Sequence, residues 1–128
     1  MTVTRQLSVL LENRRGALAE LCSKLAEKAI NIVGLSVPEQ AGEAPVRLVV
    51  NNIATARHVL DSLGLKYTED EVLAAQVSDR PGALGKLTRK LADNEVDVKY
   101  AYATIQKGTG KATVILAVSN TAAAAKIR

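Results

Sequence analysis

The sequence predicts an α+β protein made of two copies of one small module, each with the order βαββαβ and an antiparallel sheet. The first observation is a repeat: Asn13-Arg14-Arg15-Gly16-Ala17-Leu18 returns 66 residues later as Asp79-Arg80-Pro81-Gly82-Ala83-Leu84. The second is that the likeness continues past the motif, so that Ile30-Asn31-Ile32 is matched by Val96-Asp97-Val98. An internal repeat dictates the architecture of a chain. We therefore expect one module at residues 1–70 and a second at residues 71–128.

The first copy opens with a predicted strand, a turn and a helix. Arg5 to Leu11 is a short apolar run that ends in a polar turn, as is typical of a strand. Gly16 permits the tight backbone of that turn. The apolar residues that follow recur at the spacing of an amphipathic helix, namely Leu18, Leu21, Cys22 and Leu25.

The rest of the first copy consists of apolar, often β-branched runs separated by turn and capping residues. In chain order we expect a strand at Ile30–Val37, a turn region at Pro38–Pro45 around Gly42, a strand at Val46–Val50, a helix capped by Asn51 or Asn52 that ends near Gly64 and buries Ala56, Val59, Leu60 and Leu63, and a strand at Leu65–Thr68.

The second copy repeats these patterns. We expect a strand at Val72–Val77, a helix with Leu84, Leu87, Thr88 and Leu91 on one face, a strand at Val96–Gln106, a turn at Gly108-Thr109-Gly110, a strand at Lys111–Val118, and a helix capped by Asn120 or Thr121 that begins in Ala122–Ala125. Arg128 corresponds to Leu60 of the first copy. The second module is thus expected to be truncated after the start of its last helix and to lack its final strand, which leaves a sheet edge open to another chain.

Composition restricts the class of protein. Hydrophobic residues make up 48% of the chain, which favours a globular protein over a disordered one. The formal net charge is +4, but basic and acidic residues are interleaved, so the charge permits nucleic-acid binding without requiring it. Cys22 is the single cysteine, which fits a reducing compartment. No apolar run approaches the roughly 20 residues of a membrane span, and we expect a cytoplasmic protein that does not contact membranes.

The predicted βαββαβ order is the ferredoxin-like pattern, which many unrelated functions share. More specific is Val77 to Leu84, followed by an amphipathic helix and Glu95 to Val98, which resembles the start of an ACT domain. Leu10 to Leu18, followed by Ala29 to Ile32, is similar. ACT domains are small amino-acid-sensing modules of many biosynthetic enzymes, and the chain most resembles free-standing tandem ACT proteins. Arg15 departs from the family pattern, which favours proline there.

The resemblance implies a ligand site between two modules, against the loop that joins the first strand to the first helix. Elementary chemistry agrees, because glycine in such a loop allows close approach and a helix N-terminus favours a carboxylate. Asn13 and Asp79 offer oxygens that could accept from an α-ammonium group. We expect the Asp79 loop to be the principal site. The candidate ligand-binding residues are Asp79, Arg80, Pro81, Gly82, Ala83, Leu84, Asn13, Arg14, Gly16, Ala17, Leu18, Asn31, Asp97 and Tyr100.

Each candidate also has a purely structural interpretation. Asn13 and Asp79 could satisfy amides of the turn, and both glycines could serve geometry alone. Arg14 and Arg80 could be solvated surface residues. Tyr100 and Tyr102 share one strand face, where they could line a pocket or pack at an interface. Cys22 lies on an apolar helix face and fits a small core residue, while His58 has no acidic or thiol partner at motif spacing, which argues against catalysis.

These patterns favour a non-catalytic regulatory protein that binds a small molecule, most simply an amino acid, with no cofactor and no metal. No Gly-rich nucleotide loop, His/Cys cluster or nucleophile–base pair indicates an enzyme. The alternatives are a protein-interaction module without a ligand and a nucleic-acid-binding protein, for which Tyr100-Ala101-Tyr102 is the only aromatic platform. The expected partners are a second copy of the chain in a homodimer and a metabolic enzyme that the protein regulates.

Overall fold

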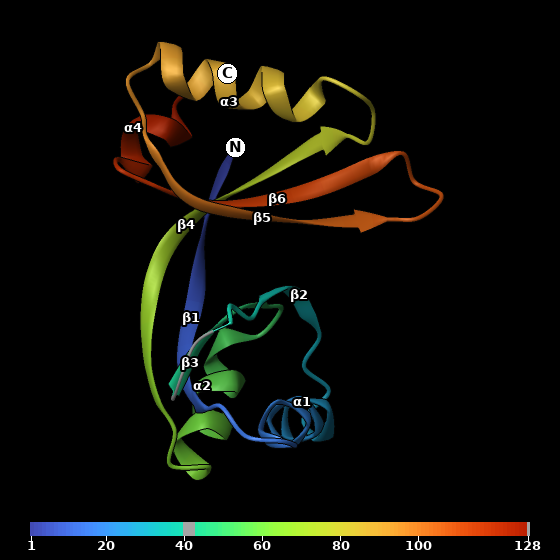
Figure 1. Ribbon diagram of the computed structural model, residues 1–128, viewed down its shortest axis with the longest axis vertical. Coiled ribbons are helices and arrows are strands. Elements are labelled where there is room, and N and C mark those ends of the chain that lie inside the picture. Colours follow the sequence, from blue (N-terminus) through green and yellow to red (C-terminus); the bar gives the residue numbers. More distant parts are fainter. Residues whose placement is uncertain (40–42, 128) are drawn as a thin grey trace. The chain divides into compact units, whose positions relative to one another are not determined.

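The computed structural model describes residues 1–39 and 43–127 (Figure 1). The elements are β1 (Thr2–Glu12), α1 (Ala17–Glu27), β2 (Ile32–Ser36), β3 (Glu43–Val50), α2 (Ile53–Ser62), β4 (Lys66–Ser78), α3 (Ala83–Asp93), β5 (Val98–Gln106), β6 (Lys111–Val118) and α4 (Thr121–Ala125). They form two compact units. The first unit is Arg5–Asp70, and the second unit combines Met1–Thr4 with the chain from Glu71 onward.

The first unit is an antiparallel sheet with two helices that share its core. Its strands follow the order β2-β3-β1-β4. Leu7 of β1 lies opposite Leu48 of β3, and Val9 lies opposite Val46. Every second residue of β1 is buried from Leu7 to Leu11, because alternate side chains of a strand point to the same face. These side chains pack with the buried faces of α1 and α2 in a cluster of Leu, Val, Ile and Ala.

The second unit repeats this arrangement. Its strands follow the order β1-β4-β6-β5, and Leu73 of β4 lies opposite Leu116 of β6. Leu87 and Leu91 of α3 are buried in the same core cluster as these two strand residues, together with Ala124 of α4. The prediction of two ferredoxin-like βαββαβ modules with antiparallel sheets is confirmed.

Two predicted N-caps are confirmed. The side-chain oxygen of Asn52 accepts a hydrogen bond from the Thr55 amide at 3.1 Å and caps α2. The side-chain oxygen of Asn120 accepts from the Ala123 amide at 3.0 Å and caps α4. Such caps satisfy amides that have no partner inside the helix, and each contributes about 1 kcal/mol of stability.

Strands β2 and β5 begin two residues later than predicted. A residue at positive φ lies two positions after the end of each preceding helix, Ala29 at 56° and Glu95 at 60°. The amides of the next residues, Ile30 and Val96, then donate to carbonyls of the last helical turn at 3.1 and 2.9 Å. These apolar residues are therefore buried at the helix ends, where they belong to the helix C-terminal cap and not to the following strand. Strand β3 also begins earlier than predicted, at Glu43, and Gly42 of the predicted turn lies outside the described residues.

Strand β4 is one continuous element of 13 residues, where the sequence suggested a strand at Leu65–Thr68 and another at Val72–Val77. The intervening residues are polar but include neither glycine nor proline, so nothing interrupts the extended backbone. Strand β1 is likewise longer than predicted. The boundary between the two units passes through both strands.

The beginning of β1 belongs to the second unit. The hydroxyl of Thr2 donates to the carbonyl oxygen of Ala74 at 3.3 Å, and Met1 packs against the core of that unit. Thr2 to Thr4 therefore occupy part of the β4 edge that was expected to remain open. Thr2 to Thr4 thus lie beside β4, where a final strand of the second copy would pair.

None of the helices in the described ranges is long and apolar enough to cross a membrane.

Candidate functional site

The two repeated loops have the same backbone structure. The Arg14 amide donates to the Glu12 carbonyl and the Arg80 amide donates to the Ser78 carbonyl, both at 2.9 Å. Gly16 and Gly82 immediately precede the helices, with φ of 87° and 89°. An added Cβ at either glycine would meet nothing within 4 Å. Backbone conformation, not crowding, therefore demands glycine at these positions.

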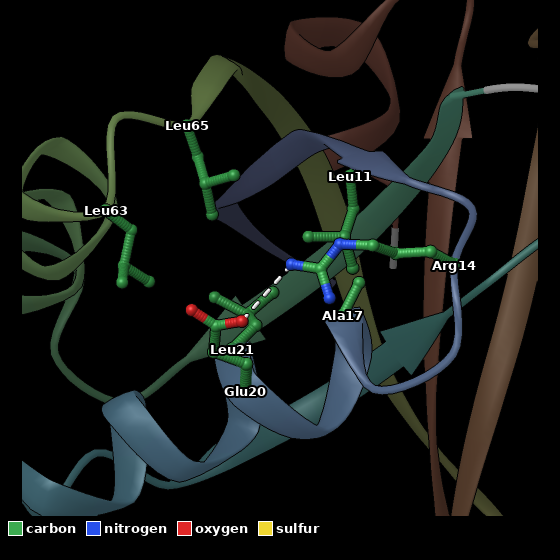
Figure 2. Close-up of a pocket in the computed structure, with 7 residues that line it drawn as sticks. All are labelled: Leu11, Arg14, Ala17, Glu20, Leu21, Leu63 and Leu65. Carbon is green, nitrogen blue, oxygen red and sulfur yellow. Dashed lines mark hydrogen bonds and ion pairs between the residues drawn. The ribbon is translucent and has the colours of Figure 1, made fainter.

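A small pocket lies behind the loop of the first unit, between β1, α1 and the segment that joins α2 to β4. Its volume is about 90 Å³, and it is lined by Leu11, Arg14, Ala17, Glu20, Leu21, Leu63 and Leu65. Figure 2 shows the Arg14 side chain extended toward Glu20 among these leucines. The Arg14 guanidinium lies 3.3 Å from a Glu20 carboxylate oxygen and 3.1 Å from one of Glu12.

This arginine is held by two carboxylates. Its pKa is raised above the ordinary value, first by the hydrogen bond to Glu20 and next by the hydrogen bond to Glu12. All three side chains are at least half exposed, so the ion pairs add little to stability. Their consequence is local, because the donors of Arg14 are already directed at carboxylates of its own unit.

A larger pocket lies at the corresponding place in the second unit. Its volume is about 230 Å³, and it is lined by Gln76, Val77, Ser78, Arg80, Ala83, Lys86, Leu87 and Lys90. Five of these residues follow five lining residues of the first pocket by 66 positions, namely Val77, Arg80, Ala83, Lys86 and Leu87. The two pockets are therefore equivalent within the repeat, a relation that the loop motif alone does not reveal.

The predicted site residues fall into two groups. Arg14 and Ala17 line the first pocket, and Arg80 and Ala83 line the second. The remaining loop residues do not contribute to either lining; these are Asn13, Gly16, Leu18, Asp79, Pro81, Gly82 and Leu84. Asp79 is anchored through its amide, which donates to the Gly110 carbonyl at 2.8 Å, while its side chain is exposed.

Asn31 and Asp97 are separated from their own loops by a whole helix. Helix α1 has 11 residues, so its ends are about 16 Å apart. The Asn31 amide donates to the side chain of Asn51, and the Asp97 amide donates to the hydroxyl of Ser119, both at 3.0 Å. Tyr100 lies on β5 opposite Ala117 and is half buried. Within one unit, these residues are not brought to the loop.

The other residues with chemical potential do not form a site in the described ranges. Cys22 is half buried on α1, and His58 is exposed on α2. Among the described residues, no group of three or more His, Cys, Asp or Glu side chains is arranged to hold a metal ion.

Comparison with known proteins identifies the family. The sequence model of the ACT domain pair matches residues 1–127. The protein BT0572 from Bacteroides thetaiotaomicron is 29% identical, with a TM-score of 0.88 over 95% of this chain and 83% of that one. The regulatory subunit of aspartate kinase from Thermus thermophilus is 12% identical, with a TM-score of 0.71 over 98% of this chain and 93% of that one. The corresponding subunit from Thermus flavus is 13% identical, with a TM-score of 0.62 over 90% and 85%.

No protein of curated function matches the sequence significantly. The two aspartate kinase subunits share the fold with this chain. The family match over nearly all residues, together with two βαββαβ units and a repeated glycine loop before the first helix of each, shows that the chain belongs to the ACT domain pair family.

Proposed function

We propose that this protein is a non-catalytic regulator that binds an amino acid between ACT modules, with the loop from Asp79 to Leu84 as its principal binding segment. The observation that carries the proposal is the repeated loop, which has the same hydrogen bonds and the same glycine conformation in both units of an ACT domain pair. The fold is also that of the aspartate kinase regulatory subunit from Thermus thermophilus. The module boundaries at 70 and 71 and the cytoplasmic location remain predictions.

The loop offers complementary chemistry for the two charged groups of an amino acid. The first amides of a helix lack intrahelical partners and favour a carboxylate, and α3 begins directly after Gly82. The exposed carboxylate of Asp79 is suited to accept from the α-ammonium group. Asn31 or Asp97, each directly before the second strand of its copy, would complete the site from another module, and Tyr100 would contact the ligand side chain.

The first experiment is a screen of the complete set of proteinogenic amino acids by thermal shift, followed by calorimetry. We expect at least one to bind, and Asp79→Ala to weaken it at least 10-fold because the partner of the ammonium group is lost. Asp93→Ala removes an exposed carboxylate at the far end of the same helix and should leave binding unchanged. Absence of binding across the whole set would refute the proposal.

A homodimer would bring further modules together. Strand β2 lies at an end of the strand order and carries the half-exposed side chains of Val33 and Leu35, followed by Val37. An exposed apolar edge strand is suited to pairing with another chain. Leu35→Lys should shift a dimer toward monomers in sedimentation equilibrium, whereas Lys28→Glu, an exposed charge change beyond α1, should not. The same surface would also serve a ligand-free interaction module, with a regulated metabolic enzyme as partner.

A further inference from the structure

The two equivalent pockets differ in charge at two matched positions. Glu12 and Glu20, the carboxylates that hold Arg14, are replaced 66 residues later by Ser78 and Lys86. The arginine itself is retained as Arg80. The repeat has thus kept the cation and exchanged both of its anionic partners, one for a hydroxyl and one for an ammonium group.

The cations of the second pocket have no acidic partner in the part of the chain that the structure describes. The ion pairs among the described residues join Arg5, Arg14, Lys24 and Arg57 to glutamates, and none involves Arg80, Lys86 or Lys90. All three of these residues line one pocket of about 230 Å³. The first pocket is lined by one arginine and one carboxylate, Glu20, and Glu12 binds the same arginine from outside the lining. The second pocket is lined by three cations and a neutral serine.

We propose that the pocket of the second unit binds a small anion with two negative charges, a phosphate group or a dicarboxylate, through Arg80, Lys86 and Lys90. In the first unit, Glu12 and Glu20 already pair with Arg14, so their negative charges disfavour binding of such an anion in the equivalent pocket. This site shares Arg80 and Ala83 with the proposed amino-acid segment, but it continues along α3 through Lys86 and Lys90 and does not include Asp79, Pro81, Gly82 or Leu84.

The placement of the cations suits such a ligand. Ala83, Lys86, Leu87 and Lys90 share one face of α3, since they follow one another at helical spacing. Arg80 approaches the same face from the loop, and its planar fork can bind two oxygens of one phosphate or carboxylate. Cations gathered without a counter-charge repel one another, and a doubly charged anion would remove that repulsion.

The pocket is large enough for the anion and for further atoms of its carrier. Its volume of about 230 Å³ is many times the roughly 10–15 Å³ that a site for a single water molecule needs. Gln76, Val77 and Ser78 also line an adjoining hollow of about 210 Å³, which Lys111 completes. A polar group attached to the anion would enter this second hollow.

The test measures binding to the full chain by calorimetry, with inorganic phosphate and malonate as doubly charged probes. Acetate and sodium chloride at equal ionic strength serve as singly charged controls. We expect one site per chain for at least one of the two probes and no more than a tenth of that affinity for acetate. Binding of phosphate alone assigns the site to phosphorylated ligands, binding of malonate alone assigns it to dicarboxylates, and either result supports the proposal.

Charge exchange between the repeats makes the test specific. Lys86→Glu should reduce binding at least 10-fold, because it places next to Arg80 the carboxylate that holds Arg14. Lys107→Glu makes the same charge change in the β5–β6 turn and should leave the affinity within 2-fold. The double variant Glu12→Ser with Glu20→Lys should open the first pocket and raise the stoichiometry from one site to two.

Three results would overturn the proposal. They are no binding of either probe, equal stabilisation by sodium chloride, and full binding by Lys86→Glu. Lys90→Gln provides a milder variant, and its expected loss of about 3-fold would be measured if Lys86→Glu failed to fold. Unchanged affinity in a folded Lys90→Gln variant would also count against the assignment.

Discussion

Substitution by alanine should change the stability of the fold in opposite directions at two glycines that lie three residues apart. Gly82 precedes α3 with φ of 89° and ψ of −15°, whereas Gly85 lies inside the helix. A Cβ would meet nothing within 4 Å at either position, so packing does not decide the outcome. The backbone conformation at each position decides the effect on stability. Gly82→Ala must adopt a left-handed conformation, which costs about 1–2 kcal/mol. Gly85→Ala gains about 1 kcal/mol, because alanine is the better helix former.

The predicted gap between the two variants is thus about 2–3 kcal/mol. Each 1 kcal/mol shifts the melting temperature of a protein of this size by about 3–5 °C. Thermal and urea unfolding, followed by circular dichroism, should place Gly82→Ala below the parent protein and Gly85→Ala above it. Gly16→Ala should behave like Gly82→Ala, since φ there is 87°. Equal midpoints for Gly82→Ala and Gly85→Ala would refute the strain argument.

Three further predictions concern stability. Asn52→Ala should lower the unfolding free energy by about 1 kcal/mol through loss of the α2 cap, and urea titration should show no such loss for Asn31→Ala, an exposed asparagine that caps no helix. Leu60→Ala, at 0% exposure, should cost about 2–5 kcal/mol by the same measurement; a loss below 1 kcal/mol would contradict the assigned core. The pKa of Glu69 is lowered, chiefly by its hydrogen bond from Arg57. The ionised carboxylate therefore stabilises the folded state above the ordinary glutamate pKa near 4.3, and this stabilisation is lost as the pH falls through the pKa of the folded state. Glu69→Gln should flatten that acid limb, and an unchanged pH profile of melting temperature would exclude the linkage.

Local chemistry made most of the fold predictable. Asn52 and Asn120 satisfy helix amides from a position next to them in sequence, and Gly16 and Gly82 mark loops whose conformation few other residues adopt. The starts of β2 and β5 were misplaced for a reason also visible locally. Ile30 is buried as a strand residue would be, but it is buried at a helix end.

The candidate site was less predictable because it depends on side chains that the fold brings together. Arg14 meets Glu12 across the turn and Glu20 across the first turns of α1, and the motif alone gives no sign of this pairing. One signal was nonetheless present in the sequence. Comparison of charges at the 66-residue offset shows Glu12 exchanged for Ser78 and Glu20 for Lys86, which marks the second loop as the more basic one.

The hydrogen bond from Thr2 to Ala74 also has a consequence for the timing of folding. The two residues are 72 positions apart, so Thr2 emerges from synthesis long before its partner exists. At 5–20 residues per second the delay is roughly 4–14 s. During that interval the strands of the first unit can form their hydrogen bonds, whereas Thr2 to Thr4 can pair only after β4 has been synthesised. The second unit thus includes residues that are synthesised before the whole of the first unit, and a ribosome that stalls before Ala74 leaves Thr2 without its hydrogen-bond partner.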